Sequence, residues 1–426
     1  MENNESLLQT TPEPQGFGAL GIDAKILEVL TALKLTVPTP IQHKAIPVAV
    51  QGKDVVGIAQ TGTGKTLAFG LPMIQRLAAM PLKKGLVVLP TRELALQVEE
   101  AMQKIGRGFG LKTAVLIGGT SMGPQISALR RNAHIIIGTP GRINDHLERR
   151  TLELSNVAIL VLDEADHMFD MGFLPQIKQI ITHVPSDRQT MLFSATMPSE
   201  ILQLATAYMK LPLRIEIAPQ GTTAERVEQE IFFIGRDQRM PLLQKILSDT
   251  HGSVLVFLRT KHTAKKICRQ LLAADITAAE IHSNRSLAQR RAALDGFKSG
   301  KYRVLVATDI AARGIDVKGI SFVVNYDLPE NSSDYVHRIG RTGRAGEAGK
   351  AISFALPDQR GKVREIERLI RNTIPVAPIP GGLPYVAPAP YEKPYSHAGY
   401  QGNKSRGGYQ GKSFGKPSFK KPFKKY

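Results

Sequence analysis

Short apolar runs rich in valine and isoleucine alternate with segments of helical period between residues 55 and 217, and no other feature limits the fold as strongly. The helical segments carry apolar residues on one face, as the spacing of Leu94, Val98 and Met102 shows. Runs that are apolar on both faces predict an α/β fold, with buried parallel strands covered by helices on both sides. We expect such strands at residues 85–89, 114–117, 134–137, 158–162 and 190–193.

The same alternation appears a second time further along the chain. Its expected strands are residues 254–258, 278–281, 304–306, 322–325 and 351–354. Residues 211–225 lie between the two sets, contain Pro212, Pro219 and Gly221, and are predicted to form a hinge linker. Two similar lobes joined in this way would leave a cleft between them, and ligands of such sheets bind at the carboxyl ends of the strands.

The composition changes abruptly in the last part of the chain. Residues 375–390 are rich in proline, and residues 393–426 contain nine Lys or Arg and no Asp or Glu. Such a segment buries too little apolar surface to offset its chain entropy, which predicts a disordered basic C-terminal tail. The expected division is residues 1–215 and 216–373 for the two lobes and residues 374–426 for the tail.

The charge balance favours a polyanionic partner. The net charge is +19 and the isoelectric point is about 9.9, so nucleic acid is expected ahead of an anionic membrane. The single cysteine, Cys268, excludes an internal disulfide and is expected to be a small buried residue on a helix. The acidic N-terminal residues lack a signal-peptide pattern and the apolar runs are too short to cross a bilayer, which predicts a soluble cytoplasmic protein.

Residues 59–66, Ala-Gln-Thr-Gly-Thr-Gly-Lys-Thr, follow an expected strand and open an expected helix, which is the context that a P-loop requires. Glycines in such a loop let backbone N–H groups close around phosphate, and the helix N-terminus adds a partial positive charge. Lys65 would reach the β- and γ-phosphates of a nucleotide, and the Thr66 hydroxyl would hold Mg²⁺. A structural loop of the same composition is the alternative. The candidate nucleotide-binding residues of the loop are Thr61, Gly62, Thr63, Gly64, Lys65 and Thr66.

An acidic run, Asp163-Glu164-Ala165-Asp166, directly follows the apolar residues 158–162. Carboxylates at the end of a buried strand would face the P-loop, where Asp163 would bind Mg²⁺ and Glu164 would orient or activate the attacking water. The alternative is a solvated acidic turn or a helix start capped by Asp163.

These motifs, together with Ser194-Ala195-Thr196 and residues 337–344, His-Arg-Ile-Gly-Arg-Thr-Gly-Arg, make the chain resemble the DEAD-box RNA helicase family. The resemblance covers about residues 17–372, and within the family it is most similar to the bacterial RhlE-type members. It implies two tandem RecA-like lobes, and ATP and Mg²⁺ as cofactors.

The resemblance also assigns roles around the nucleotide. Gln42 matches the glutamine of the Q motif, which pairs with adenine, and Phe17 matches its upstream aromatic residue. Lys34-Leu35 stands where the family usually has a glycine and an aromatic residue, so adenine stacking is expected to be weaker or apolar.

In the second lobe, Arg341 and Arg344 match the arginine fingers that reach the γ-phosphate, and Asp316 matches a residue that contacts the ribose. Ser194 and Thr196 match the motif that couples hydrolysis to strand separation, by hydrogen bonds to Asp166 and to the second lobe.

A further group of residues matches the family's RNA-binding positions at the edges of the two lobes. Helix N-termini, glycines and arginines there are suited to gripping phosphates without reading base sequence, although each alone could merely cap a helix. The matched residues are Arg92, Gly118, Gly119, Thr139 and Arg142 in the first lobe and Arg290 and Thr308 in the second. Leu287 and Ser283 depart from the usual Gln and Gly, so one contact is expected to be missing or supplied by Gln289.

The tail interleaves cations with aromatic side chains. Cations neutralise phosphates and aromatic rings stack on bases, which suggests a salt-sensitive, sequence-tolerant RNA tether; the alternative is a tail that only keeps the protein soluble. The residues concerned are Lys404, Arg406, Tyr409, Lys412, Phe414, Phe419, Lys420 and Phe423.

Taken together, the resemblance implies an RNA-stimulated ATPase that unwinds or remodels short RNA duplexes and RNA–protein complexes locally, without processive tracking. An ATP-gated RNA clamp or assembly scaffold, and a DNA helicase, are the alternatives. Ribosomal precursors and RNA-degradation proteins are expected partners, with roles in ribosome assembly or RNA degradation.

Overall fold

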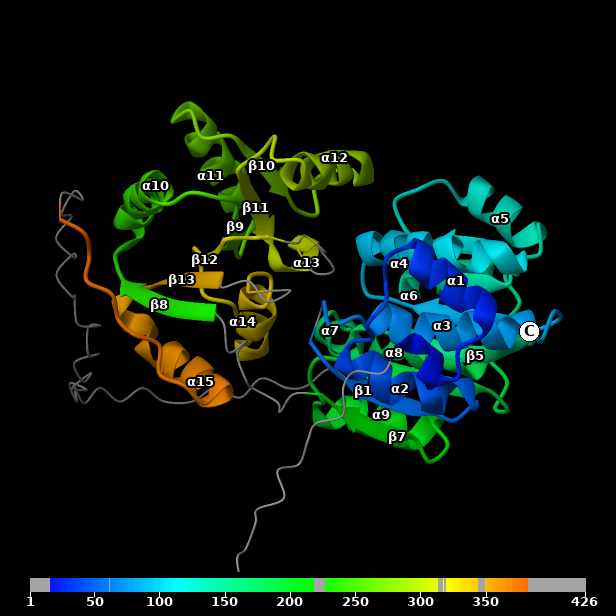
Figure 1. Cartoon of the computed structure of the whole chain (residues 1–426). Coiled ribbons are helices and arrows are strands. Elements are labelled where there is room, and N and C mark those ends of the chain that lie inside the picture. Colours follow the sequence, from blue (N-terminus) through cyan, green and yellow to red (C-terminus); the bar gives the residue numbers. More distant parts are fainter. Residues whose placement is uncertain are drawn as a thin grey trace, which may run out of the picture. The chain divides into compact units, whose positions relative to one another are not determined.

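The computed structural model describes residues 16–60, 62–217, 227–312, 317, 319–343 and 349–381. Two parallel β-sheets with helices on both faces make up this part of the chain (Figure 1). Since each sheet has its own cores, the predicted α/β fold with two lobes is confirmed.

The first sheet has the strand order β3-β4-β2-β5-β6-β1-β7, and all its pairs are parallel. The five strands expected from sequence are present, each displaced by at most one residue at either end. The strands are β1 Val55–Ile58, β2 Lys84–Val88, β3 Thr113–Leu116, β4 Ile135–Gly138, β5 Val157–Leu162, β6 Gln189–Ser194 and β7 Leu213–Glu216.

Helices cover both faces of this sheet because its strands are apolar on both sides. In β5, Ile159 and Val161 enter one core whereas Leu160 and Leu162 enter the other. The first core is closed by η1 Phe17–Leu20, α1 Ala24–Ala32, α2 Pro40–Val50, α3 Lys65–Ala78 and α4 Arg92–Gly106. The second core is closed by α6 Pro140–Glu148, α7 Ala165–Asp170, α8 Leu174–Thr182 and α9 Ser199–Tyr208. The remaining elements of this lobe are η2 Arg107–Phe109 and α5 Met122–Arg130.

The second sheet has the strand order β10-β11-β9-β12-β13-β8, again entirely parallel. Its strands are β8 Val227–Phe233, β9 Val254–Leu258, β10 Ala278–Ile281, β11 Val304–Thr308, β12 Phe322–Asn325 and β13 Gly349–Ala355. The five expected strands are confirmed, and β8 is an additional edge strand.

The helices of the second lobe pack into three cores. They are η3 Arg236–Gln238, α10 Arg239–Asp249, α11 Lys261–Ala273, α12 Leu287–Lys298, α13 Asp309–Ala312, α14 Ser332–Ile339, η4 Pro357–Gln359 and α15 Arg360–Ile370. Cys268 is buried on α11 as predicted, and its burial raises the pKa of the thiol to about 11.

The structure corrects the start of the predicted hinge linker. Residues 213–216 form β7, which pairs with β1 and completes the first sheet, so they are not linker. The sequence pattern of β7 does not indicate a buried strand, because only Ile215 of its four residues is buried. Residues 218–226, the rest of the expected linker, lie outside the described residues.

The start of the predicted tail is also different. Ile374 is buried in a core of the second lobe, and the N–H of Ile231 in β8 donates to the carbonyl of Pro375. The N–H of Ala377 in turn donates to Ile231, so the chain keeps to the fold beyond residue 374. Residues 382–426, which include every residue of the predicted RNA tether, lie outside the described residues. Over the residues that are described, we find no helix long and apolar enough to cross a membrane.

Candidate functional site

The P-loop leaves β1 and enters α3 through two glycines in left-handed backbone. Gly62 has φ 87° and Gly64 has φ 91°, values that favour glycine. Lys65 is the first residue of α3, only 5% of its side chain surface is exposed, and its Nζ donates to the carbonyl of Ala59 at 3.0 Å. The ammonium is therefore held over the loop, at the N-terminus of the helix. Thr66 is half-buried in the same turn, and Thr61 lies outside the described residues.

Gln42 connects helix α2 to the P-loop. Its Oε1 accepts from the N–H of Thr39 at 2.9 Å, and its Nε2 donates to the carbonyl of Gly64 at 3.0 Å. A Cβ on residue 64 would overlap this amide, so glycine is required there by space as well as by φ. Phe17 is 4% exposed in the core beneath, which leaves its ring mostly occupied by packing.

The acidic run after β5 is buried, which argues against a solvated acidic turn. Asp163, Glu164 and Asp166 are each 2–3% exposed. Burial raises the pKa of Asp163 to about 6, against the attraction of Lys65, which lowers it. Such a desolvated carboxyl is suited to meeting a cation, and the neighbouring ammonium to meeting a phosphate.

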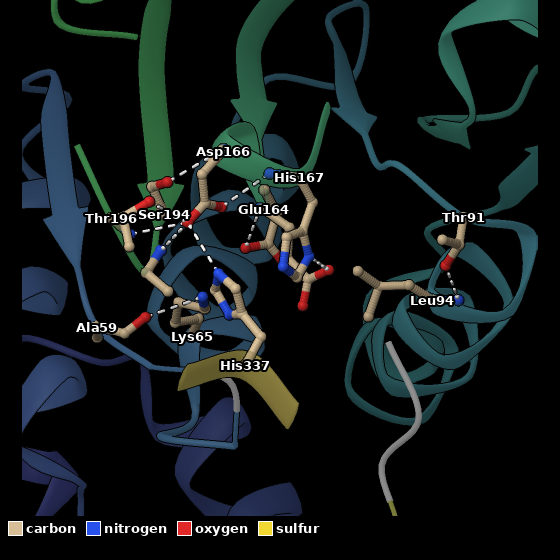
Figure 2. Close-up of polar contacts among 12 residues, drawn as sticks. Ala59, Lys65, Thr91, Leu94, Glu164, Asp166, His167, Ser194, Thr196 and His337 are labelled. Atoms are coloured by element: carbon tan, nitrogen blue, oxygen red, sulfur yellow. Dashed lines mark hydrogen bonds and ion pairs between the residues drawn. The ribbon is translucent and has the colours of Figure 1, made fainter. Parts of the chain in front are cut away.

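Glu164, and not Asp163, occupies the N-cap position of α7, with no side-chain cap hydrogen bond. Its backbone has φ 53° and ψ 50°, a left-handed conformation that costs a glutamate about 1–3 kcal/mol. Such strain is common where the position of a side chain matters to function. One carboxylate oxygen lies 2.9 Å from Nδ1 of His167 (Figure 2). Burial alone would raise the pKa of Glu164, but His167 lowers it to about 2, so the group is ionised.

Asp166 is bound by the Ser194–Thr196 segment at the end of β6 (Figure 2). Its Oδ2 accepts from the Thr196 N–H at 2.8 Å and from the Thr196 hydroxyl at 2.9 Å, while its own N–H donates to the Ser194 hydroxyl at 3.2 Å. The Ala195 N–H adds a bond at 3.1 Å. Burial favours the neutral acid, but His167 and these donors hold the pKa of Asp166 well below its usual range.

Two histidines that the sequence did not mark as functional complete this cluster. His337 of α14 places Nε2 3.7 Å from Oδ2 of Asp166, and its ring lies edge-on to His167 with 4.2 Å between centroids. Burial lowers the pKa of His337 to about 3, so its ring is neutral. His337 belongs to the recognised motif at residues 337–344, whereas His167 follows the acidic run with no sequence signal of its own.

The arginines of that motif divide into two kinds. Arg341 is buried and lies near enough to Glu164 to lower its pKa, whereas Arg344, like Asp316, lies outside the described residues. Arg338 is 1% exposed; it binds both carboxylate oxygens of Asp309, at 2.5 and 2.7 Å, and the Asp327 carbonyl at 2.6 Å. Arg338 therefore stabilises the interior of the second lobe, a structural role that the sequence motif did not predict.

Three predicted RNA-binding elements of the first lobe meet at one edge of the sheet. Arg92 begins α4, and its guanidinium lies against Gly118 and Gly119, where a Cβ on residue 119 would overlap it. Thr139 is the N-cap of α6. Arg142 in the same helix donates to the Thr120 carbonyl at 3.1 Å. Glycines and helix starts at this edge leave room for a phosphate backbone.

Arg290 of the second lobe joins this group. Burial, followed by the charge of Arg290 and that of Arg142, lowers the pKa of Arg92, while Glu93 raises it, so both arginines lie near Arg92. Arg290 also forms an ion pair with Glu93 in which both side chains are largely buried. Thr308 ends β11 and lies in a different groove, beside Ser283.

The departures around Arg290 have structural consequences. Leu287 is partly buried against the core of the first lobe, so an apolar contact takes the place of the usual polar one. Gln289 caps α12, since its Oε1 accepts from the Ser286 N–H at 3.0 Å. The capping box holds this side chain by its oxygen, and a role of Gln289 as a donor to RNA stays a prediction.

Comparisons with known proteins agree with this arrangement. A family model described as DEAD/DEAH box helicase matches residues 39–204, and one described as helicase conserved C-terminal domain matches residues 238–346. The chain is 42% identical over 358 residues to the ATP-dependent RNA helicase CshA of Listeria monocytogenes, covering 84% of this chain and 69% of that protein.

Solved structures are similar over most of the described residues. Dbp5 of S. cerevisiae bound to RNA and ADP BeF3 matches with a TM-score of 0.77 at 30% identity, covering 85% of this chain and 96% of that chain. A DEAD box protein from the hyperthermophile Methanococcus jannaschii matches with a TM-score of 0.52 at 39% identity, covering 85% of this chain and 99% of that one.

Proposed function

This chain belongs to the DEAD-box ATP-dependent RNA helicase family, and from that premise we propose that it hydrolyses ATP in response to RNA and separates short RNA duplexes locally. The observation that carries the proposal is the buried acidic run after β5, which faces the P-loop lysine and is bound to the Ser194–Thr196 segment. Hydrogen bonds therefore connect the residues proposed for hydrolysis to the Ser194–Thr196 segment.

ATP is the nucleotide. The P-loop N–H groups and Lys65 would hold its phosphates, with Gly62, Thr63 and Gly64 shaping the loop. Gln42 lies beside the loop and would read the adenine edge with the hydrogen-bonding capacity that its two internal bonds leave free. Phe17 would support this region from the core.

The donor set fits Mg²⁺. Asp163 and Thr66 offer one carboxylate and one hydroxyl oxygen beside the phosphate site, and Mg²⁺ typically takes few protein ligands and keeps several waters. When bound, the ion would neutralise phosphate charge and hold the nucleotide in one orientation. The raised pKa of Asp163 supports this assignment, since a buried carboxyl of this kind gains a partner for its charge.

Glu164 would orient and activate the water that attacks the γ-phosphate. It is ionised and held on one oxygen by His167, as a base of defined orientation must be. Arg341 would supply positive charge to the transition state from the second lobe, together with Arg344, and Asp316 would contact the ribose.

RNA would lie along the edge formed by the guanidinium cluster and the glycine turn of the first lobe. Its contacts would be Arg92, Gly118, Gly119, Thr139 and Arg142, with Arg290 and Thr308 contributed by the second lobe. Backbone contacts of this kind predict binding that tolerates any sequence. Arg290 would exchange its ion pair with Glu93 for a phosphate.

Coupling would run through Asp166. Because Ser194 and Thr196 bind this residue and His337 lies beside it, a change at the phosphate would be transmitted to the end of β6 and to α14.

We also propose that the chain is divided into an N-terminal lobe, a C-terminal lobe and an RNA-binding tail, with the tail beginning after residue 377.

Finer assignments rest on resemblance alone. Placement among the RhlE-type members, a cytoplasmic location, and work on ribosomal precursors or with RNA-degradation proteins are proposals of this kind. They fit a basic RNA-directed motor, and the net charge of +19 supports an RNA-rich setting.

The decisive experiment measures steady-state ATP hydrolysis with and without single-stranded RNA, using single-stranded DNA and Glu164→Gln as controls. Strong stimulation by RNA that Glu164→Gln abolishes is the expected result. Release of a short labelled duplex then separates unwinding from an ATP-gated clamp, which would hydrolyse ATP without releasing a strand. An ATP-binding protein that RNA does not stimulate would contradict the proposed function.

A further inference from the structure

The outer face of helix α11 carries a stripe of positive charge. The inner face packs Ile267 and Leu271 into a core of the second lobe. Four exposed residues on the outer face follow the i, i+3, i+4, i+7 spacing that places side chains on one side of a helix. They are His262, Lys265, Lys266 and Arg269, here called the α11 stripe.

The α11 stripe differs from other charged helix faces in lacking acidic residues. In α4, Lys104 pairs with Glu100 at 2.8 Å, and in α10, Lys245 pairs with Asp249 at 2.8 Å. Helix α11 has no Asp or Glu at all. Among the described residues, no hydrogen bond or ion pair involves the side chain of any member of the stripe. Unpaired like charges at this spacing repel one another, so an anionic partner would stabilise the face.

The stripe begins at the groove that contains Thr308. Lys261 and His262 line this groove together with Ser283 and Thr308. The stripe and the groove therefore share one residue, His262. Seven residues separate His262 from Arg269, which is about 10 Å along a helix. In double-stranded DNA the phosphates of one strand recur about every 3.4 Å along the axis, so a stripe of this length spans more than one phosphate of a nucleic-acid strand.

Carboxylates that border the groove do not cancel this charge. Four carboxylates line the groove: Asp170, Asp309, Glu330 and Asp334. Asp309 is bound by Arg338, Glu330 lies 4.0 Å from Arg259, and Asp170 and Asp334 also have interaction partners. The negative groups of these two pairs are therefore matched by guanidinium groups, whereas the cations of the stripe face solvent.

We propose that the α11 stripe binds the phosphate backbone of RNA that extends beyond the groove, and so holds the segment flanking the site. The inference rests on the proposed function, since it extends the RNA surface that Thr308 would begin. Continuity with the groove, and a length that spans more than one phosphate of a strand, favour RNA over an acidic protein. Contacts of this kind would be independent of base sequence and strongly dependent on salt.

The test uses the full chain with three substitutions in the stripe, Lys265→Gln, Lys266→Gln and Arg269→Gln. The matched control removes the same charge from exposed, unpaired arginines in and after α15, by Arg364→Gln, Arg368→Gln and Arg371→Gln. Glutamine is a good helix former, so both proteins should fold, which thermal denaturation checks. The probes are a short single-stranded RNA that fills only the groove and the same RNA extended by a duplex.

We expect the stripe variant to bind the extended RNA about tenfold more weakly at low salt, with a salt slope smaller by about 2. Its affinity for the short RNA and its maximal RNA-stimulated ATPase rate should match those of the wild type and of the control variant. Wild-type affinity for the extended RNA, or an equal loss for both RNAs, would overturn the inference. Failure of the proposed function would look different, because the wild type itself would then show no stimulation by RNA.

Discussion

At the scale of single residues, the burial of Asp163 destabilises the folded protein in the absence of its ligands, and ligand binding would offset this cost. A carboxyl whose pKa rises from 3.8 to about 6 on folding binds its proton more tightly in the folded chain than in the unfolded one. Below pH 4 this carboxyl does not change the free energy of unfolding. It lowers the free energy of unfolding as the pH rises through 4 to 6, and above pH 6 the loss stays at about 3 kcal/mol at most.

We therefore predict that Asp163→Asn abolishes ATP hydrolysis and stabilises the fold at pH 7.5 by about 1–3 kcal/mol. The asparagine keeps an acceptor for the Glu164 N–H, which now donates to Asp163 at 2.9 Å, and carries no charge to bury. Urea unfolding without Mg²⁺ at pH 4.5 and pH 7.5 measures the effect. The gain should shrink at the lower pH, and a variant no more stable than the wild type at pH 7.5 would contradict the argument.

His167 is expected to set the orientation of Glu164. Because Glu164 is ionised and can only accept, the hydrogen on the 2.9 Å bond belongs to Nδ1 of the histidine. His167→Leu should lower kcat about tenfold with little change in the KM for ATP, an effect typical of groups that orient others. His167→Asn places an amide N–H near the position of Nδ1 and should recover most of the loss.

Steady-state kinetics and thermal denaturation of both variants test this prediction. A purely structural histidine would give two variants ranked by stability alone. Wild-type kcat in His167→Leu would show that Glu164 needs no such support.

Lys34 stands where the family usually has a glycine, and its backbone conformation is strained. It adopts φ 57°, a conformation that suits the glycine usual at this position, and its side chain is exposed. Lys34→Gly should stabilise the first lobe by about 0.5–1 kcal/mol, the relieved strain exceeding the added entropy of the unfolded chain. Lys34→Ala keeps the Cβ and is the control. Equal melting temperatures for the two variants would remove strain as the explanation.

At the scale of elements, the sequence revealed the strands that are buried on both faces and missed β7 and β8, two of the four edge strands. β5 and β9 could be predicted because every residue but one in them is buried. β7 has the sequence Leu-Arg-Ile-Glu with one buried residue, and β8, at an edge of the second sheet, has three buried residues among its seven. Pairing partners, which no local pattern encodes, decide whether such segments become strands.

The network around Arg338 could likewise not be predicted from sequence, since its partners come from two other elements and a loop. The guanidinium joins Asp309 in α13, Asn325 in β12 and the Asp327 carbonyl. Arg338→Met should destabilise the second lobe by about 3–5 kcal/mol, because it leaves the Asp309 carboxylate and the amide oxygen of Asn325 without their guanidinium partner. Urea unfolding measures this loss. The double variant Arg338→Met with Asp309→Asn should regain part of it, and an unchanged midpoint in the single variant would contradict the role.

At the scale of the whole molecule, the residues of the candidate site come from two independently packed sheets. The P-loop and acidic run were predictable because each is a contiguous motif between a strand and a helix. The proximity of Arg341 to Glu164 and of Arg290 to Arg92 was not, because only the folded chain brings these positions together. Ligands that touch residues of both lobes must therefore influence each other's binding.

This dependence has a quantitative form. By linkage, RNA must raise the affinity for a non-hydrolysable ATP analogue by the same factor as the analogue raises the affinity for RNA. If Arg341 brings the second lobe to the γ-phosphate, Arg341→Ala should reduce that factor about tenfold in both directions, while the affinity for RNA without nucleotide stays unchanged. Fluorescence titrations of each ligand, with and without saturating amounts of the other, give both factors independently. A variant that keeps the wild-type factor would place the coupling elsewhere, with Asp166 and its hydrogen bonds to Thr196 the first alternative to measure.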